Sequence, residues 1–329
     1  MVEHALMKTV GIVLGAGGLV GQAFQSGVLA SLETDLGWDP RRADVIVGTS
    51  AGALSGTALR MDTEVLDLAQ WTLGGVTEGQ LLSEFHAVRQ SLPPPRLRTV
   101  LRPWRTPSRG AVLAALRRTA EFRSLALLAT IVPTGHVSMM DHVDFSRGAL
   151  PGVWPDGLRI CACRRSDGAR VVFGIPGAPE ATLTAAAAAS CAIPGYLAPV
   201  VIDGIPYIDG GAWSPTNADV LIDDHLDLVL VVSPMSGTSR NWDWALRRWA
   251  RRRLQREIDA LEATGTQVVC FEPGVDTVSK MGLDPMARDR NPEVLRSAFF
   301  EAGRHLADPV IRRRLNAHIG PTAVAVEKG

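Results

Sequence analysis

Residues 45–59, VIVGTSAGALSGTAL, contain the turn that decides the fold. The apolar run 45–47 predicts a buried strand, and the small residues after Ser50 predict a helix. A serine between a strand and a helix, in the pattern Gly-x-Ser-x-Gly, is typical of a nucleophile elbow. Gly48 and Gly52 permit a sharp turn and a close approach of strand and helix, and the N–H groups that begin the helix favour an oxyanion. Ser50 is therefore a candidate nucleophile, with a simple helix N-cap as the alternative interpretation.

A second glycine-rich turn lies upstream of the elbow. Residues 9–14, TVGIVL, predict a buried strand that runs into Gly15-Ala16-Gly17-Gly18-Leu19-Val20-Gly21 and then into a helix. Successive N–H groups in such a turn can bind a phosphate or the oxyanion of a tetrahedral intermediate. A dinucleotide site would need glycine or alanine where Val20 stands, and an acidic residue after the second strand, where the serine elbow stands instead. The pattern favours an oxyanion site.

A third motif, Asp209-Gly210-Gly211, follows the strand-like residues 206–208. An aspartate at a strand end before two glycines is presented at a turn with little steric cover. The nearby Asp203-Gly204 is typical of an ordinary β-turn, and Asp209 stands out from it only through its combination with the two upstream motifs.

These three motifs, in this order, resemble the patatin-like phospholipases over about residues 8–234. Residues 16–21 match the glycine-rich turn of that family, and residues 189–195, ASCAIPG, are also similar to it. The resemblance implies a three-layer α/β/α fold with a mostly parallel central sheet and a helical insertion. It implies an enzyme that cleaves carboxylic ester bonds of acyl lipids without metal or organic cofactor. Its residues would be the nucleophile Ser50, the general base Asp209, the oxyanion donors Gly17 and Gly18, and the supporting glycines Gly15, Gly21, Gly48, Gly52, Gly210 and Gly211.

The chain departs from the family pattern at two positions. Ala16 replaces a glycine, which is a mild change, and Val20 replaces the usual lysine or arginine. The missing cation weakens the expectation that the substrate is an anionic phospholipid and leaves a neutral acyl ester open.

The implied mechanism is a Ser-Asp dyad that acts through an acyl-enzyme. An aspartate with a pKa of about 3.9 is a poor base at neutral pH, so Asp209 is expected to be desolvated and its pKa raised. A Ser-His-Asp triad is the rival mechanism, but His225, His305 and His318 have the surroundings of surface residues, and His136 and His142 precede Asp209. A lipid transacylase and a non-catalytic lipid-binding relative remain as further alternatives.

The chain is expected to form one acyl hydrolase domain over residues 1–320. Six strands are predicted, at residues 10–14, 45–48, 158–163, 171–173, 228–232 and 268–271. Residues 73–153 are rich in proline and arginine and predict an exposed helical insertion, either a cap over the site or a surface loop. Residues 321–329 predict a flexible tail.

Composition indicates a cytoplasmic enzyme of bacterial origin. The 329 residues are 46% hydrophobic with zero formal net charge, which gives no case for a nucleic-acid partner. Cys161, Cys163, Cys191 and Cys270 lack metal-binding spacing and are expected to be reduced and buried. Neither an export signal nor an apolar run long enough to cross a membrane is evident.

A tryptophan- and arginine-rich helix is predicted around residues 241–261, which include Trp242, Trp244 and Trp249. Two interpretations are open: peripheral contact with an anionic membrane surface, or Trp and Leu packed on the core with the arginines in water. The second is the favoured one.

Overall fold

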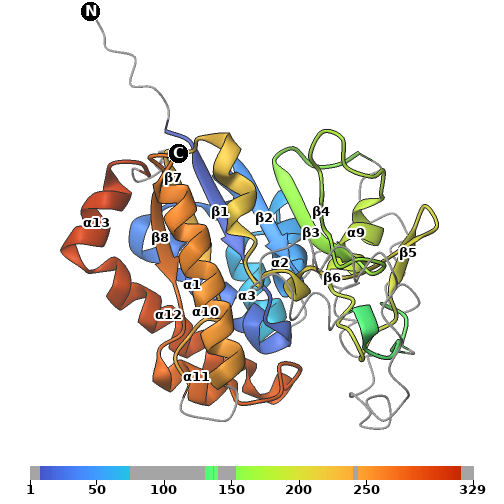
Figure 1. Ribbon diagram of the computed structural model, residues 1–329. Coiled ribbons are helices and arrows are strands. Elements are labelled where there is room, and N and C mark those ends of the chain that lie inside the picture. The colour runs from blue at the N-terminus through green and yellow to red at the C-terminus, as the bar shows by residue number, and fades with distance from the viewer. Residues whose placement is uncertain (1–7, 75–129, 136, 140–152, 240–243, 320–329) are drawn as a thin grey trace, which may run out of the picture.

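The computed structural model describes residues 8–74, 130–135, 137–139, 153–239 and 244–319. Within this part of the chain, eight strands form one sheet. The strand order is β5-β6-β3-β2-β1-β7-β8, and β4 pairs with β3 (Figure 1). The strands are β1 Val10–Leu14, β2 Val45–Thr49, β3 Leu158–Arg164, β4 Arg170–Phe173, β5 Val200–Ile202, β6 Ile205–Asp209, β7 Leu228–Val232 and β8 Gln267–Phe271. All six predicted strands are confirmed, each within one residue at either end.

Five neighbouring strands, β3, β2, β1, β7 and β8, are parallel. Ile12 of β1 is in register with Ile46 of β2 on one side and with Leu230 of β7 on the other. These strands are almost entirely apolar because both faces of a parallel sheet are covered. The expected mostly parallel α/β sheet is therefore confirmed.

The sheet becomes antiparallel beyond β3. This strand pairs antiparallel with β4 and with β6, and β6 pairs antiparallel with β5. Along β3, Cys161 is in register with Thr49 of β2 and Ala162 with Asp209 of β6. One strand thus separates the end of β2, where the elbow begins, from the end of β6, where the Asp-Gly-Gly motif begins.

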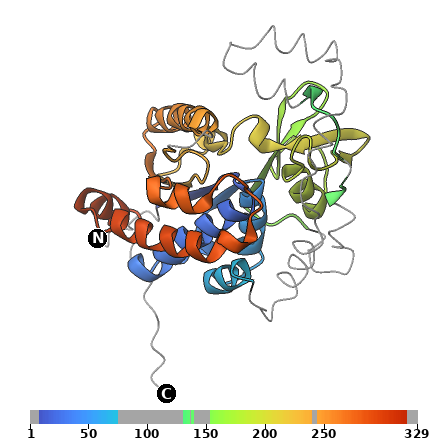
Figure 2. The same ribbon diagram turned by 90° about the horizontal axis from the view of Figure 1, so that it is seen from below.

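Alternate strand residues enter two separate cores. Ile12, Ile46 and Leu230 contribute to the larger one, whereas Val47 and Val231 contribute to the smaller one on the opposite face. The helices are α1 Gly18–Leu36, α2 Ala51–Arg60, α3 Val65–Thr72, α9 Leu183–Ser190, α10 Trp244–Glu262, α11 Val275–Met281, α12 Asn291–Leu306 and α13 Pro309–Asn316. Side chains from α1, α3, α9 and α12 join the larger core, and those of α10 join the smaller one, so the architecture has three layers. Figure 2 shows α1 and α12 side by side.

The favoured interpretation of the tryptophan-rich helix is confirmed in part for α10, because Leu254 and Leu261 pack in the smaller core. The buried face of α10 also includes Arg247 and Arg253, however, whereas Trp244 is 52% exposed. The two arginines are buried because each finds an acceptor in the interior: Arg247 donates to the carbonyl of Pro234, and Arg253 lies 3.9 Å from the carboxylate of Glu257. Trp242 lies outside the described residues.

Most of the predicted insertion, together with His136 and His142, lies outside the described residues, and so does the predicted tail. Among the described helices, none combines the length and apolar character needed to span a bilayer.

Candidate active site

The glycine-rich turn joins β1 to α1 and is anchored by its first two N–H groups. Gly15 donates to the carbonyl of Val232 at 2.9 Å and Ala16 to the carbonyl of Pro215 at 2.7 Å. Gly18 has a φ of 63°, and a Cβ on it would lie 2.5 Å from the carbonyl oxygen of Pro285, so glycine is required there. Within the described chain no acceptor pairs with the N–H groups of Gly17 and Gly18. Both are therefore available to an oxyanion at the start of a 19-residue helix.

The elbow has the strained geometry expected of a nucleophile turn. Ser50 has φ 55° and ψ −118°, a left-handed conformation that non-glycine residues rarely adopt. A Cβ on Gly48 would lie 2.6 Å from Cα of Ala53, and one on Gly52 would lie 1.9 Å from the carbonyl oxygen of Leu14. The two flanking glycines are thus required by close backbone contact, as the motif predicts.

The third motif stands beside the elbow. The Ser50 hydroxyl lies close enough to the carboxylate of Asp209 to stabilise its charge, and Oδ1 of that carboxylate accepts the N–H of Gly211 at 2.7 Å. Both side chains are buried, with Ser50 4% and Asp209 6% exposed. A Cβ on Gly211 would lie 3.3 Å from Cβ of Ala16, which places the Asp-Gly-Gly turn against the glycine-rich turn. Three motifs that are far apart in the sequence meet at one point.

Asp209 has a markedly shifted acidity. Burial raises its pKa to about 6, although the N–H of Gly211 and the hydroxyl of Ser50 oppose this shift by stabilising the carboxylate. The expectation that Asp209 is desolvated and its pKa raised is confirmed. A carboxylate with this pKa accepts a proton near neutral pH far better than a solvated aspartate does.

Cys191 is a neighbour that the sequence motifs do not single out as a site residue. Its thiol lies beside the Ser50 hydroxyl, and burial raises the pKa of the thiol, so the group is neutral. Its signal in the sequence was the similarity of residues 189–195 to the family. The described chain contains no disulfide, and of the four cysteines only Cys270 is not fully buried.

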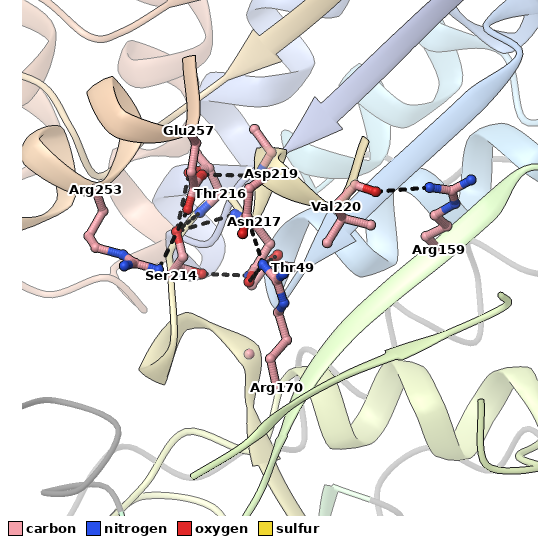
Figure 3. Close-up of polar contacts among 12 residues, drawn as sticks. Thr49, Arg159, Arg170, Ser214, Thr216, Asn217, Asp219, Val220, Arg253 and Glu257 are labelled. Atoms are coloured by element: carbon pink, nitrogen blue, oxygen red, sulfur yellow. Dashed lines mark hydrogen bonds and ion pairs between the residues drawn. The ribbon is translucent and has the colours of Figure 1, made fainter. Parts of the chain in front are cut away.

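A buried polar network lies behind the elbow, on the side of α10 (Figure 3). The amide of Asn217 donates to the hydroxyl of Thr49, the residue before Ser50, and to the carbonyl of Ser214. Glu257 of α10 accepts the hydroxyl of Thr216 at 2.6 Å and the N–H of Ala218 at 2.9 Å. These contacts connect the elbow strand to a helix on the outer layer.

Burial, together with the nearby charge of Asp219, raises the pKa of Glu257, while hydrogen bonds from Ser214, Thr216 and Ala218 act in the opposite direction. Asp219 itself forms an ion pair with Arg170 (Figure 3). Glu257 was not predicted as part of the site, because its position in a charged helix resembles that of a surface residue.

Val20, which stands where the family usually has lysine or arginine, is buried. The side chain is 3% exposed within the larger core, and its N–H donates to the carbonyl of Pro285 at 3.2 Å. An apolar residue therefore occupies the family's cation position, and it is packed rather than presented to a ligand.

The histidines of the rival triad lie in other surroundings. His225 is exposed at the end of the 3-10 helix Ala218–Asp224. His305 packs against Phe271 with ring centroids 5.3 Å apart, and burial lowers its pKa, while Nδ1 of His318 is hydrogen-bonded to the carbonyl of Arg314. In the described part of the chain, no hydrogen bond joins any of the three to Ser50 or Asp209.

The solved structures described here are similar to this chain at low sequence identity. The chain is similar to VipD from Legionella pneumophila, with 11% identity, a TM-score of 0.44 and coverage of 95% of this chain and 67% of that one. It is also similar to the type III effector protein ExoU, with 16% identity, a TM-score of 0.38 and coverage of 93% and 53%. A third similar structure is that of human GIVD cytosolic phospholipase A2 in complex with methyl gamma-linolenyl fluorophosphonate. Its identity is 14%, its TM-score is 0.43, and the match covers 95% of this chain and 59% of that one. The chain thus spans between about half and two thirds of these proteins.

The comparison with curated proteins gives no match. A family model does match, and it covers residues 12–222, which include the glycine-rich turn, the elbow and the Asp-Gly-Gly motif. This match extends over more than half of the chain and includes the three motifs that meet at the site. The chain belongs to the patatin-like phospholipase family of lipid acyl hydrolases.

Proposed function

We propose that Ser50 and Asp209 form a catalytic dyad that hydrolyses carboxylic ester bonds of acyl lipids through an acyl-enzyme. The observation that carries this proposal is the proximity of the Ser50 hydroxyl to the buried carboxylate of Asp209, whose pKa is raised to about 6. The strained elbow supports it, and so do the N–H groups of Gly17 and Gly18, which have no acceptor among the described residues.

In the first half of the reaction Ser50 Oγ attacks the ester carbonyl as Asp209 takes the hydroxyl proton. The negative oxygen of the tetrahedral intermediate accepts hydrogen bonds from Gly17 and Gly18. When the intermediate collapses, the ester C–O bond breaks and the leaving alcohol takes the proton from Asp209. The neutral Cys191 thiol beside Ser50 adds no competing base at this point.

In the second half a water molecule attacks the acyl-enzyme and gives a proton to Asp209. Collapse of the second intermediate breaks the bond to Ser50 Oγ, which takes that proton back, and a fatty acid is released. The same residue thus serves as base and then as acid in each half.

The substrate is an acyl lipid, either a phospholipid or a neutral ester. Val20 gives no cation for an anionic head group in the glycine-rich turn. We further propose that the enzyme works in the cytoplasm and meets lipid at a membrane surface. The exposed Trp244 and Leu246 at the start of α10, with the guanidinium of Arg248 5.9 Å from the Trp244 ring centroid, support such contact. Cosedimentation with anionic and neutral vesicles checks this contact, and recovery of all protein in the supernatant would speak against it.

The dyad is tested with p-nitrophenyl acyl esters of graded chain length, phospholipid vesicles and a fluorophosphonate probe. We expect Ser50→Ala to abolish labelling and turnover, and Asp209→Asn to lower the rate by about 10²–10⁴-fold. The wild-type kcat/KM should rise with pH up to about 6, the pKa of Asp209, and then level off.

Two matched variants serve as controls. Asp203→Asn makes the same change at an exposed Asp-Gly pair in the β5–β6 hairpin and should leave the rate unchanged. His305→Ala removes a residue of the rival triad and should do the same. Full activity in Ser50→Ala would refute the dyad, and loss of activity in His305→Ala would favour the triad.

A further inference from the structure

The segment Ser190-Cys191-Ala192, at the C-terminal end of α9, contacts both members of the proposed dyad. The hydroxyl of Ser190 accepts the main-chain N–H of Ser50 at 2.8 Å, and the Cys191 thiol lies beside the Ser50 hydroxyl. The carbonyl of Ala192 accepts the main-chain N–H of Asp209 at 3.0 Å. Three consecutive residues therefore hold the serine and the aspartate in position relative to each other.

The Ser190 hydroxyl takes the place of one main-chain hydrogen bond between β2 and β3. Ile46 donates its N–H to the carbonyl of Gly157, and donors alternate along a strand of a parallel sheet. Continuing by four residues on each strand, in two steps of two, would bring the N–H of Ser50 to the carbonyl of Cys161. In the structure Ser50 donates to Ser190 instead, and Ser190 donates at 2.6 Å to that same carbonyl of Cys161. The Ser190 hydroxyl therefore connects the N–H of Ser50 to the carbonyl of Cys161.

The bridge is needed because the elbow turns the chain away from the ladder. Ser50 leaves the extended conformation for φ 55° and ψ −118°, and its N–H moves away from β3. The carbonyl of Cys161 and the hydroxyl of Ser190 are both fully buried. Without the hydroxyl, a donor and an acceptor would stay unpaired beside the nucleophile.

We propose that Ser190 is a positioning residue, which holds the main chain of Ser50 in the elbow conformation and thereby aims its hydroxyl at the substrate carbonyl. This inference rests on the proposed Ser50–Asp209 dyad. Accepting one hydrogen bond while donating another requires a hydroxyl at this position, so serine or threonine can fill the role and alanine cannot. Mere packing, by contrast, would be satisfied by alanine, the residue that fills most of α9.

The test compares Ser190→Ala, Ser190→Thr and wild type in the rate of fluorophosphonate labelling, in kcat and KM, and in Tm. We expect Ser190→Ala to lower the labelling rate and kcat by about 10- to 100-fold with KM changed less than about twofold, because misplacement of a nucleophile acts on the reaction step. Ser190→Thr restores the hydroxyl and should recover most of the rate.

Ser26→Ala is the matched control. Ser26 is a fully buried serine of α1 whose hydroxyl is hydrogen-bonded to that of Thr72, away from the dyad. The Ser26→Ala substitution should lower Tm and leave the labelling rate close to that of wild type. If Ser190→Ala does not fold, Ser190→Cys, which offers only a weak donor of similar size, takes its place with the same expected loss of rate.

Labelling of Ser190→Ala at the wild-type rate would overturn the positioning role while the dyad stands, provided that Ser50→Ala abolishes labelling. Ser190→Thr as slow as Ser190→Ala would also overturn it, because the hydroxyl would then not be the group that matters. If wild type does not label, or Ser50→Ala still labels, the dyad is wrong and the role of Ser190 falls with it.

Discussion

Asp209 makes stability depend on pH in the direction opposite to that of a carboxylate in a surface ion pair. Burial raises its pKa from 3.8 to about 6, so the folded chain holds the proton more tightly than the unfolded chain does. The stability due to the protonated form is complete below about pH 4 and is lost as the pH rises through about 6. The difference between the two pKa values corresponds to about 3 kcal/mol.

We therefore expect Asp209→Asn to be more stable than wild type above the pKa of Asp209, and about equally stable below about pH 4. Asparagine keeps an acceptor for the N–H of Gly211 and removes the buried charge. Urea denaturation at about pH 4 and about pH 7.5 measures this difference, which should approach 3 kcal/mol at the higher pH. The exposed Asp203→Asn should show no such pH dependence. A less stable Asp209→Asn at the higher pH would mean that the carboxylate is better compensated than its burial suggests.

Single residues of the site were predictable where local backbone geometry restricts the residue type. Ser50 and Asp209 stand beside glycines that close contacts require, and such spacing can be read from the sequence. Ser190 could not be identified in this way. It ends an alanine-rich helix, and its role depends on contacts with Ser50 and Cys161, which are distant in the chain. Only the strand order makes those contacts visible.

At the scale of elements, α1 and α12 approach each other closely at Gly27. A Cβ there would lie 2.4 Å from the carbonyl oxygen of Leu295 and 2.8 Å from Cβ of Ala298, both on α12. We expect Gly27→Ala to destabilise the protein by about 1–3 kcal/mol, because the helices must separate to accept the methyl group. The intrinsic helix preference of alanine offsets only about 1 kcal/mol of this loss.

Gly303→Ala on α12 is the matched control. Its new Cβ would lie 3.0 Å from Oδ2 of Asp35, the movable end of a side chain. Stability should be unchanged or rise by up to about 1 kcal/mol. Thermal denaturation of both variants measures the contrast, and equal effects of the two substitutions would contradict the close packing at Gly27.

Elements were predictable where a run of apolar residues is long enough to show its period. The parallel strands were found because both of their faces are buried, whereas β5 has three residues and one of them, Val201, is 63% exposed. The packing of α10 was predicted for its leucines but not for Arg247 and Arg253. Arginine normally faces water, and the buried acceptors that keep Arg247 and Arg253 inside lie on other segments or a turn away on the same helix.

At the scale of the whole molecule, the order of the strands brings the motifs together. Alternation of strands and helices predicts a mostly parallel sheet, but it does not predict that β3 lies between β2 and β6. That arrangement places the end of β6 one strand away from the elbow, and β6, which delivers Asp209, is antiparallel to β3. The meeting of Ser50 and Asp209 is therefore a property of topology, which the sequence supported through family resemblance alone.

The buried carboxylate of Glu257 connects the outer layer to this centre. It accepts hydrogen bonds from Thr216 and Ala218, next to the Asn217 that bonds to Thr49, and it is paired with Arg253. We expect Glu257→Ala to destabilise the protein by about 3–5 kcal/mol, because it leaves two buried donors without this acceptor and a buried guanidinium without its counter-charge. Glu257→Gln keeps an acceptor and should lose less. Urea denaturation of both variants gives the comparison.

Glu262→Ala, at an exposed position of the same helix, shows what removal of a surface carboxylate does and should change stability by less than about 0.5 kcal/mol. If Glu257→Ala were as mild as Glu262→Ala, α10 would be held by Leu254, Leu261 and their apolar neighbours alone. The expected large loss would instead mean that the polar network holds the outer helix against the sheet. Thr49 would then be supported from two layers at once, because Asn217, which donates to it, lies between Thr216 and Ala218, and both of these are anchored to α10.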